Sequence, residues 1–168
     1  VRVDATTISG TASDAEEGIA AYAFSTETSL SKESGAWIGV TEPAAGSKTF
    51  PCDLMSIEGG NDCGAIYFYA MDKDGNITRS ENPIRVTKIQ LNDYYENNAF
   101  TSKTVYFIGD TNPTLPSTER LGYRFDGWYF DSSYENVANA FTHEADSVIV
   151  HAKWIAESRS SLRLHRRI

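Results

Sequence analysis

The chain of 168 residues is poor in the side chains and motifs on which most enzymes depend. It contains three histidines and two cysteines, but no G-x-S-x-G elbow, H-E-x-x-H motif, phosphate-binding loop or dinucleotide fingerprint. His143, His151 and His165 are far apart in sequence, and the sequence shows no nucleophile and base that can be paired. The adjacent acids Glu16 and Glu17 indicate a solvated loop rather than a glycosidase pair. We predict that the protein is not an enzyme and needs no cofactor.

A basic surplus and long apolar runs are also missing. The formal net charge is -8, although the stretch 158–168 carries four arginines and no acid. Phosphate binding needs a basic footprint, so the acidic body argues against a nucleic-acid partner. No apolar run approaches the roughly 20 residues of a membrane helix, so we expect no membrane insertion.

The two ends of the chain lack recognisable targeting signals. Val1 is not a methionine and shows no signal-peptide pattern, so we expect a piece of a longer precursor. The basic tail, residues 158–168, has neither strand alternation nor a helical stripe. It is predicted to be a disordered terminus or a vector-derived extension.

What the first half does contain is a series of short β-forming runs between clusters of Gly, Ser, Asn and Asp. This spacing predicts a β-sandwich over residues 1–86. In the run from Ala65 to Met71, alternation places Ile66, Phe68 and Ala70 inside. The expected strands are Thr6 to Ala12, Ile19 to Ser25, Trp37 to Val40, Ser47 to Leu54, Ala65 to Met71 and Asn76 to Val86, with rings contributed by Tyr22, Phe24 and Trp37.

These runs carry a family resemblance. The segment from Gly18 to Ser25, then Trp37, then Tyr69-Ala-Met-Asp72-Lys-Asp-Gly-Asn76, resembles the bacterial immunoglobulin-like modules found in tandem on Gram-positive surface proteins. The resemblance implies a seven-strand sandwich with a spacer or presentation role and without an active site.

Asp72, Asp74 and Asn76 form a weak candidate metal site, because alternate oxygen ligands begin an EF-hand loop in the same way. The pattern then fails, since glycine falls at the fourth position, at Gly75, and Pro83 stands where the bidentate carboxylate belongs. A hairpin turn is the favoured interpretation, and no metal is predicted.

Cys52 and Cys63 flank a ten-residue loop and are the only cysteines. In an extracellular compartment a disulfide between them would stabilise the fold by roughly 3 kcal/mol. Two unpaired thiols remain the alternative. A zinc site is disfavoured because no pair of histidines stands at ligand spacing.

The second half is the most aromatic part of the chain. Alternation predicts two strands with one aromatic face, and Trp128, out of phase after Gly127, indicates a β-bulge. Apolar residues in the segment Glu135 to Phe141 predict one short helix, giving an α+β layer. The expected strands are Val86 to Leu91, Lys103 to Ile108, Tyr123 to Tyr129 and Val148 to Trp154.

A second resemblance rests on this aromatic stretch. The motif consists of Gly122, Tyr123, Phe125, Gly127, Trp128 and Tyr129, followed by Ala152, Lys153 and Trp154. It resembles the Listeria-Bacteroides repeat, the internalin B-repeat type of module, over residues 87–157. The chain departs from that family at Asn92-Asp-Tyr94, where the family has Asn-Gly-Gly. The resemblance implies a β-grasp-like fold and an extracellular module of bacterial surface proteins that serves as a stalk or in adhesion.

Taken together, these patterns predict a mainly β, non-catalytic pair of modules on the bacterial cell surface or secreted from it. One alternative is direct binding of a glycan or host protein. The candidate contact surface is then Trp128, Tyr129 and Tyr134, or Tyr94 and Tyr95, provided that the rings are uncovered. Another is an accessory region of a large secreted hydrolase. The expected partners are neighbouring modules of the same precursor and, in the binding alternative, the glycan or host protein.

Overall fold

The computed structural model describes residues 6–62 and 64–158 and is mainly β. Cys63 and most of the predicted basic tail, 159–168, lie outside the described residues, as does Val1. The first half consists of β1 (Thr7–Asp14), β2 (Ile19–Ser25), β3 (Ile38–Gly39), β4 (Gly46–Asp53), two short 3-10 helices (Leu54–Ser56 and Gly60–Asp62), β5 (Gly64–Asp72) and β6 (Ile77–Arg79).

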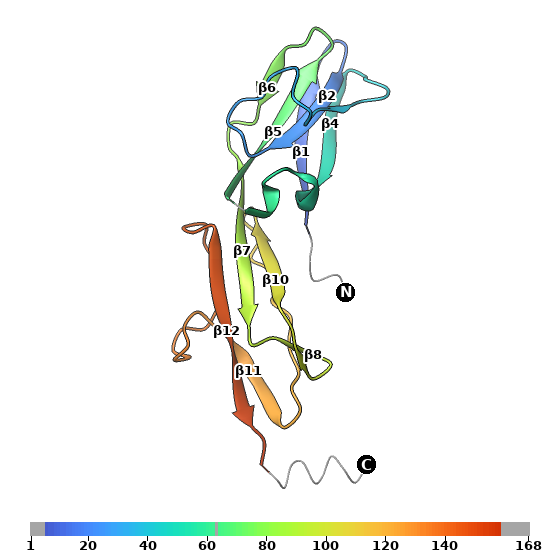
Figure 1. The fold of residues 1–168 in the computed structure, drawn as a ribbon. Coiled ribbons are helices and arrows are strands. Elements are labelled where there is room, and N and C mark those ends of the chain that lie inside the picture. Colours follow the sequence, from blue (N-terminus) through green and yellow to red (C-terminus); the bar gives the residue numbers. More distant parts are fainter. Residues whose placement is uncertain (1–5, 63, 159–168) are drawn as a thin grey trace.

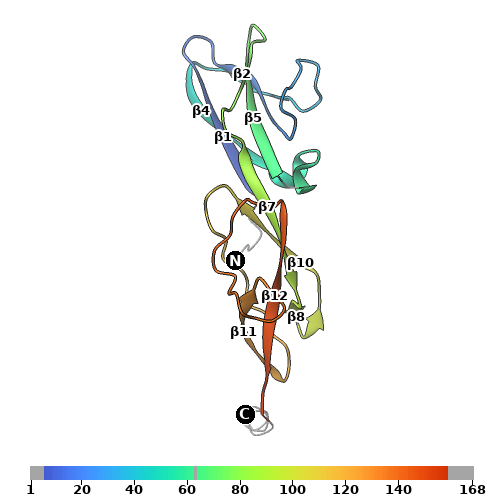
Figure 2. The ribbon, with the colours of Figure 1, turned by 90° about the vertical axis from the view of Figure 1, so that its left-hand side faces the viewer.

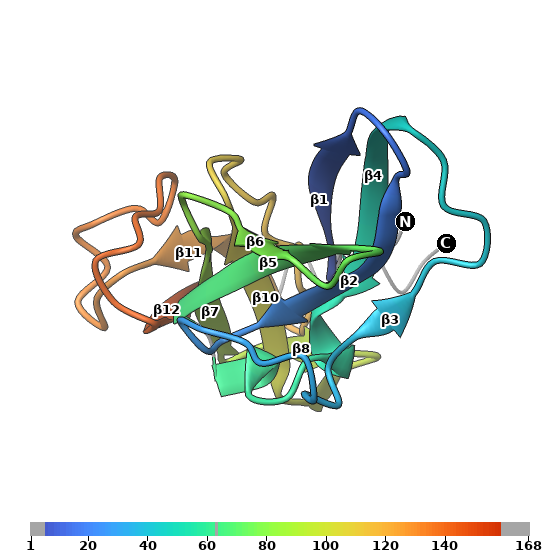
Figure 3. The ribbon, with the colours of Figure 1, turned by 90° about the horizontal axis from the view of Figure 1, so that it is seen from above.

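The strands of the first half form two layers. In one layer β1 pairs with β4, and in the other β2 lies between β3 and β5, with β6 beside β5. Figure 3 shows β1 and β4 on one side and β2, β5 and β6 on the other. Ile66, Phe68 and Ala70 are buried between the layers, as their alternation predicts. The sandwich-like character of this half is therefore confirmed.

The opposite face of β5 is also covered. Tyr69 is buried, and its hydroxyl donates to the carbonyl of Glu27 at 2.6 Å. Trp37 packs against its edge at 6.4 Å, and Leu30 joins the same small cluster. The loop that connects β2 to β3 thus closes over a second apolar face, which explains why β5 is apolar on both sides.

One strand runs from the first half into the second. β7 (Ile84–Asn92) pairs with β5 through residues 84–86 and then with β10 and β12 through residues 86–92. The predicted module boundary at Val86 therefore falls inside a continuous strand. Figures 1 and 2 show β7 along the long axis of an elongated molecule, between the two sets of strands.

The second half is built on this strand. It comprises the hairpin of β8 (Tyr95–Glu96) and β9 (Ala99–Phe100), then β10 (Lys103–Ile108), β11 (Tyr123–Tyr129) and β12 (Ser147–Ala156). The strand order is β10, β7, β12, β11, and the central pair, β7 and β12, is parallel. A separate apolar core lies against this sheet, with Ile89, Val150 and Ala152 fully buried.

The predicted helix from Glu135 to Phe141 is wrong, and with it the α+β assignment. This segment runs extended beside the end of β11, where the backbone N–H of Ala138 donates to the carbonyl of Trp128 at 2.8 Å. The side chain of Asn112 holds it from the other side by bonding the backbone of Asn139 and Phe141. These long-range partners take the backbone groups that a helix would have bonded internally.

The helices of the described residues are two 3-10 turns of 3 residues each. No helix among residues 6–62 and 64–158 is long and apolar enough to cross a bilayer.

Candidate functional site

The aromatic stretch folds into β11 and β12, which pair antiparallel. Phe125 lies opposite Trp154 and Trp128 lies opposite Ala152, so β11 has one extra residue between these pairs. Gly127 supplies the positive φ, 110°, that this irregularity uses. The predicted bulge is confirmed, and it brings the rings of Phe125 and Trp128 to 5.3 Å on the same side of the sheet.

Trp128, a candidate contact residue, is buried with 6% of its surface exposed. Its ring stacks on that of Tyr94, which is also buried, at 6.4 Å and 13°. The indole N–H donates to the carbonyl of Pro116 at 2.8 Å. With its ring packed against Tyr94 and Phe125 and its N–H bonded, Trp128 belongs to the core, where a ligand cannot reach it.

Two further candidate contact residues lie at the surface. Tyr129 and Tyr134 are half-buried and meet edge to face at 5.6 Å. The Lys153 ammonium lies 5.4 Å from the ring centre of Tyr129 and 6.0 Å from that of Tyr134. Lys153 also lies 3.6 Å from Asp126. The result is a surface cluster of two phenols, one cation and one carboxylate, from β11, β12 and the loop after β11.

Asp131 holds the loop that carries Tyr134. Its carboxylate accepts hydrogen bonds from the backbone N–H groups of Glu135 at 3.0 Å and Asn136 at 2.8 Å, and from the Ser133 hydroxyl. The Glu135 N–H and the Ser133 hydroxyl are the largest causes that hold the pKa of Asp131 well below its usual range. Tyr134 sits in this turn with φ of 60°, a left-handed conformation that an isolated tyrosine rarely adopts.

We expect Asp131→Asn to loosen this loop without unfolding the protein. An amide accepts more weakly than a carboxylate, so amide exchange at Glu135 and Asn136 should rise about tenfold. Hydrogen exchange read by NMR would measure it, with Asp110→Asn as the matched surface control. Unchanged exchange at Glu135 and Asn136 would mean that the carboxylate does not hold the turn.

The same carboxylate sets an expected pH dependence. The pKa of Asp131 is lowered in the folded state. Its contribution to the stability of the turn is therefore complete above its usual pKa, 3.8, and is lost as the pH falls toward the lowered value. The protection of Glu135 and Asn136 should therefore survive at pH 4. Loss of protection already at pH 5 would contradict the prediction.

A second aromatic group lies at the start of β11 and is more exposed. The Arg120 guanidinium lies 4.0 Å from the ring centre of Tyr123 and 4.9 Å from that of Tyr95. Around it, Phe100 and Leu121 are 63% and 78% exposed. Sequence analysis named Tyr95 and Tyr123 but missed the rest of this group, because its members come from separate turns. The hairpin of β8 and β9 places Phe100 in this group. Its local signal in the sequence is Asn97-Asn98, since both residues have a positive φ.

The remaining motif residues, Gly122, Ala152 and Trp154, stabilise the fold. Gly122 has a φ of 83° in the turn before β11, and its carbonyl accepts from the N–H of Glu157. Ala152 is fully buried. Trp154 is half-buried, contacts Tyr95 at 5.7 Å and donates its indole N–H to the carbonyl of Asp93.

The weak metal candidate lies in the turn between β5 and β6. The two Asp72 carboxylate oxygens accept from the backbone and side-chain N–H groups of Asn76, each at 2.8 Å. The Asn76 side chain is the main reason that the pKa of Asp72 is lowered. Within residues 6–62 and 64–158, no three His, Cys, Asp or Glu side chains gather as a metal site. This geometry is that of a hairpin turn, with β5 and β6 paired on either side of it.

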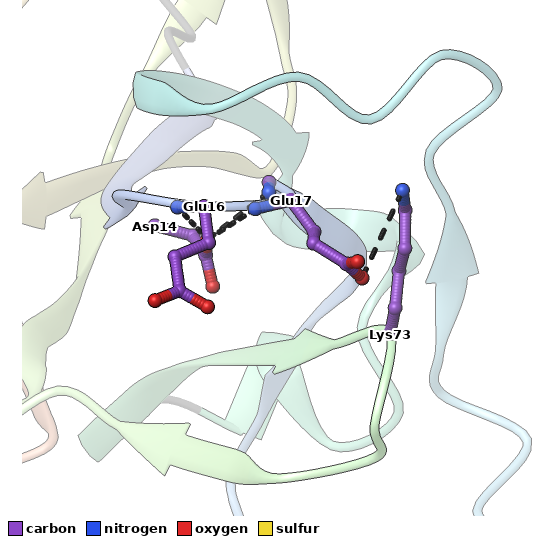
Figure 4. A network of polar contacts seen from close by, with 5 residues as sticks. Asp14, Glu16, Glu17 and Lys73 are labelled. Atoms are coloured by element: carbon purple, nitrogen blue, oxygen red, sulfur yellow. Dashed lines mark hydrogen bonds and ion pairs between the residues drawn. The ribbon is translucent and has the colours of Figure 1, made fainter.

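The acidic pair Glu16 and Glu17 lies in the turn after β1. Figure 4 shows the carboxylate of Asp14 beneath this turn, where one oxygen accepts backbone N–H groups from Glu16, Glu17 and Gly18. The bond from Glu16 is the largest cause of the lowered pKa of Asp14. Glu17 lies 4.0 Å from Lys73, and both side chains are about half exposed or more, so this ion pair contributes little stability.

The proposed disulfide cannot be placed, because Cys63 lies outside the described residues. Cys52 is half-buried in β4, and its sulfur lies 3.5 Å from the Ser56 hydroxyl. The pairing stays a prediction, which the intact mass before and after alkylation would check.

Comparison of the chain with protein-family models, with curated proteins and with solved structures found no match.

Proposed function

We propose that the chain is a non-catalytic, extracellular pair of modules from a bacterial surface protein, and that it acts as a stiff spacer. The observation that carries this proposal is β7, a single strand of nine residues that takes part in both halves. A strand paired on both sides resists bending, because any bend must break ladder hydrogen bonds at the junction. A flexible linker between the halves would offer no such resistance.

Two features support the family assignments within this proposal. The order β10, β7, β12, β11 with a parallel central pair is that of a β-grasp sheet, which supports a Listeria-Bacteroides repeat over residues 87–157. The two facing layers of the first half support an immunoglobulin-like module. In place of the β-grasp helix, this chain has the extended segment that Asn112 and β11 hold.

Stiffness is the property to test. Nitrogen-15 relaxation of the intact chain should fit one elongated rotational diffusion tensor for amides of β2 and β5 together with those of β10 and β12. Two separate tensors would mean that the halves tumble independently, and the spacer proposal would then fail. The comparison needs no substitution, so misfolding of a variant cannot confuse it.

The surface cluster of Tyr129, Tyr134 and Lys153 favours a second candidate, the direct binding of a glycan or host protein. Two half-exposed rings with a cation and a carboxylate beside them offer both stacking and hydrogen bonds. A glycan array and a panel of host-matrix proteins would test it, with Tyr129→Ala and Tyr134→Ala as variants. A signal that both variants abolish would establish binding, and its absence with folded protein would reject it.

A further inference from the structure

β1 is an edge strand of the first half. In the described part of the chain β1 pairs with β4 alone. The N–H of Leu54 donates to the carbonyl of Thr6, the residue opposite it, at 2.8 Å, so the even-numbered residues of β1 bond toward β4. The backbone N–H and C=O groups of Thr7, Ser9, Thr11 and Ser13 therefore point the other way. No residue among 6–62 and 64–158 bonds to them.

Residues 7–13 of β1 contain no feature that protects this edge. Strand edges are commonly blocked by a charged side chain, a proline or a bulge. The residues from Thr7 to Ser13 include no charge and no proline, and their register with β4 is unbroken. The outer edge of β4 differs, because Pro51 removes a donor there and Lys48 adds a charge.

A groove lies beside the open edge. Its volume is about 310 Å³, and it runs between the second half of β1 and the segment Thr78 to Ser80. Ile19, Phe68 and Ala70 form its floor, which is the side of the apolar core. An added strand bonded to β1 would cover this floor.

We propose that the occupant of this edge is β1 of a second copy of the chain, paired antiparallel about a two-fold axis at Gly10. In this register Ser9 of one copy lies opposite Thr11 of the other, and Thr7 opposite Ser13, so every free backbone group is bonded. On the core-facing side, Ile8 lies opposite Ala12, and glycine meets glycine at the axis. The large side chain of Ile8 in one copy thus lies beside the small side chain of Ala12 in the other, which lines the groove.

The same register pairs hydroxyl side chains on the outer face and keeps the acidic side chains of the two copies apart. Thr7, Ser9, Thr11 and Ser13 would form a ladder of hydroxyls, as Thr11 already does with Thr49 at 2.7 Å. Asp14 of each copy would lie opposite Thr6 of the other. The two acids would then be about 27 Å apart at 3.3 Å per residue, well beyond the screening length in physiological salt.

Sedimentation equilibrium of the intact chain tests the pairing. We expect a monomer–dimer equilibrium with a dissociation constant on the order of 100 µM, because one strand pair buries less area than a standard interface. Ser9→Pro removes an edge N–H that β4 does not use, and should weaken the dimer at least tenfold. A chain that stays monomeric at about 1 mM, or a dimer that Ser9→Pro leaves unchanged, would overturn the proposal.

Ser47→Pro is the matched control. The N–H of Ser47 points to the outer edge of β4 as that of Ser9 points to the outer edge of β1, so both variants place proline on an outward position of the same layer. Ser47→Pro should dimerise like the native chain, and circular dichroism would establish that both variants are folded. Equal weakening by both variants would also contradict the proposal.

Cysteine cross-linking tests the register without proline. In a background with Cys52 and Cys63 replaced by serine, Ser9→Cys and Thr11→Cys should form a mixed disulfide when combined, because opposed residues of a strand pair lie within bonding distance. Each variant alone should form little covalent dimer. Mixed product no more abundant than the single-variant products would reject the register and with it the dimer about Gly10.

Discussion

Replacing Trp128 by alanine is expected to destabilise the protein by about 3–5 kcal/mol, the usual loss when a buried aromatic ring is removed. The ring is in contact with Tyr94 and Phe125, and the indole N–H bonds the carbonyl of Pro116. Its loss leaves a cavity and an unpaired carbonyl, so both the packing and the loop before β11 should suffer. Urea denaturation followed by the fluorescence of the remaining tryptophans would measure the change.

Tyr129→Ala is the matched control for Trp128→Ala. Tyr129 is the next residue of the same strand but is half-buried, and its contacts are with Tyr134 and Lys153 at the surface. We expect a loss of about 1 kcal/mol or less, as for other surface positions. Equal losses for the two variants would contradict the assignment of Trp128 to the core and of Tyr129 to the surface.

The second large effect is expected at Gly10. A Cβ atom at this position would lie closer to the Phe68 ring than real contacts allow. Gly10→Ala should therefore destabilise the first half by about 2–3 kcal/mol, near the upper end of the usual cost of overpacking. Thermal unfolding followed by circular dichroism would measure the shift. Gly39→Ala in β3 is the matched control, because nothing lies within 4 Å of its added Cβ.

A double variant tests the cause of the Gly10 effect. Phe68→Leu shortens the ring that the new methyl group would meet, at a cost of its own. Because the two residues are in contact, the loss in the double variant should be smaller than the sum of the two single losses. Additive losses would show that Gly10 is needed for a reason other than the Phe68 ring.

Much of the strand pattern was predictable, because alternation and turn residues act over short stretches of chain. The bounds of Ile19–Ser25, Lys103–Ile108 and Tyr123–Tyr129 agree with the predicted ones. The bulge next to Gly127 was also predictable, since a bulky residue out of phase after a glycine is a local signal of a β-bulge. Prediction failed for the segment 135–141, where the apolar spacing suits a helix but Asn112 and β11 take its backbone groups.

The candidate contact surface could be predicted only in part. Aromatic residues in adjacent positions of a strand point to opposite faces, so Trp128 and Tyr129 lie on different sides of the sheet. Which of them faces the core depends on Tyr94, Pro116 and the other residues that cover that face. Those partners are distant in sequence, and no pattern within the motif identifies them.

The β-rich class, most of the strands, the bulge and the acidic composition can be read from the amino-acid sequence alone. Three further features are evident only in the folded chain: β7 pairs in both halves, Trp128 is covered, and β1 has an open edge beside a groove. The difference lies in the range of the interactions. Side-chain periodicity and turn chemistry are local, whereas strand neighbours and ring burial depend on segments that meet only after folding.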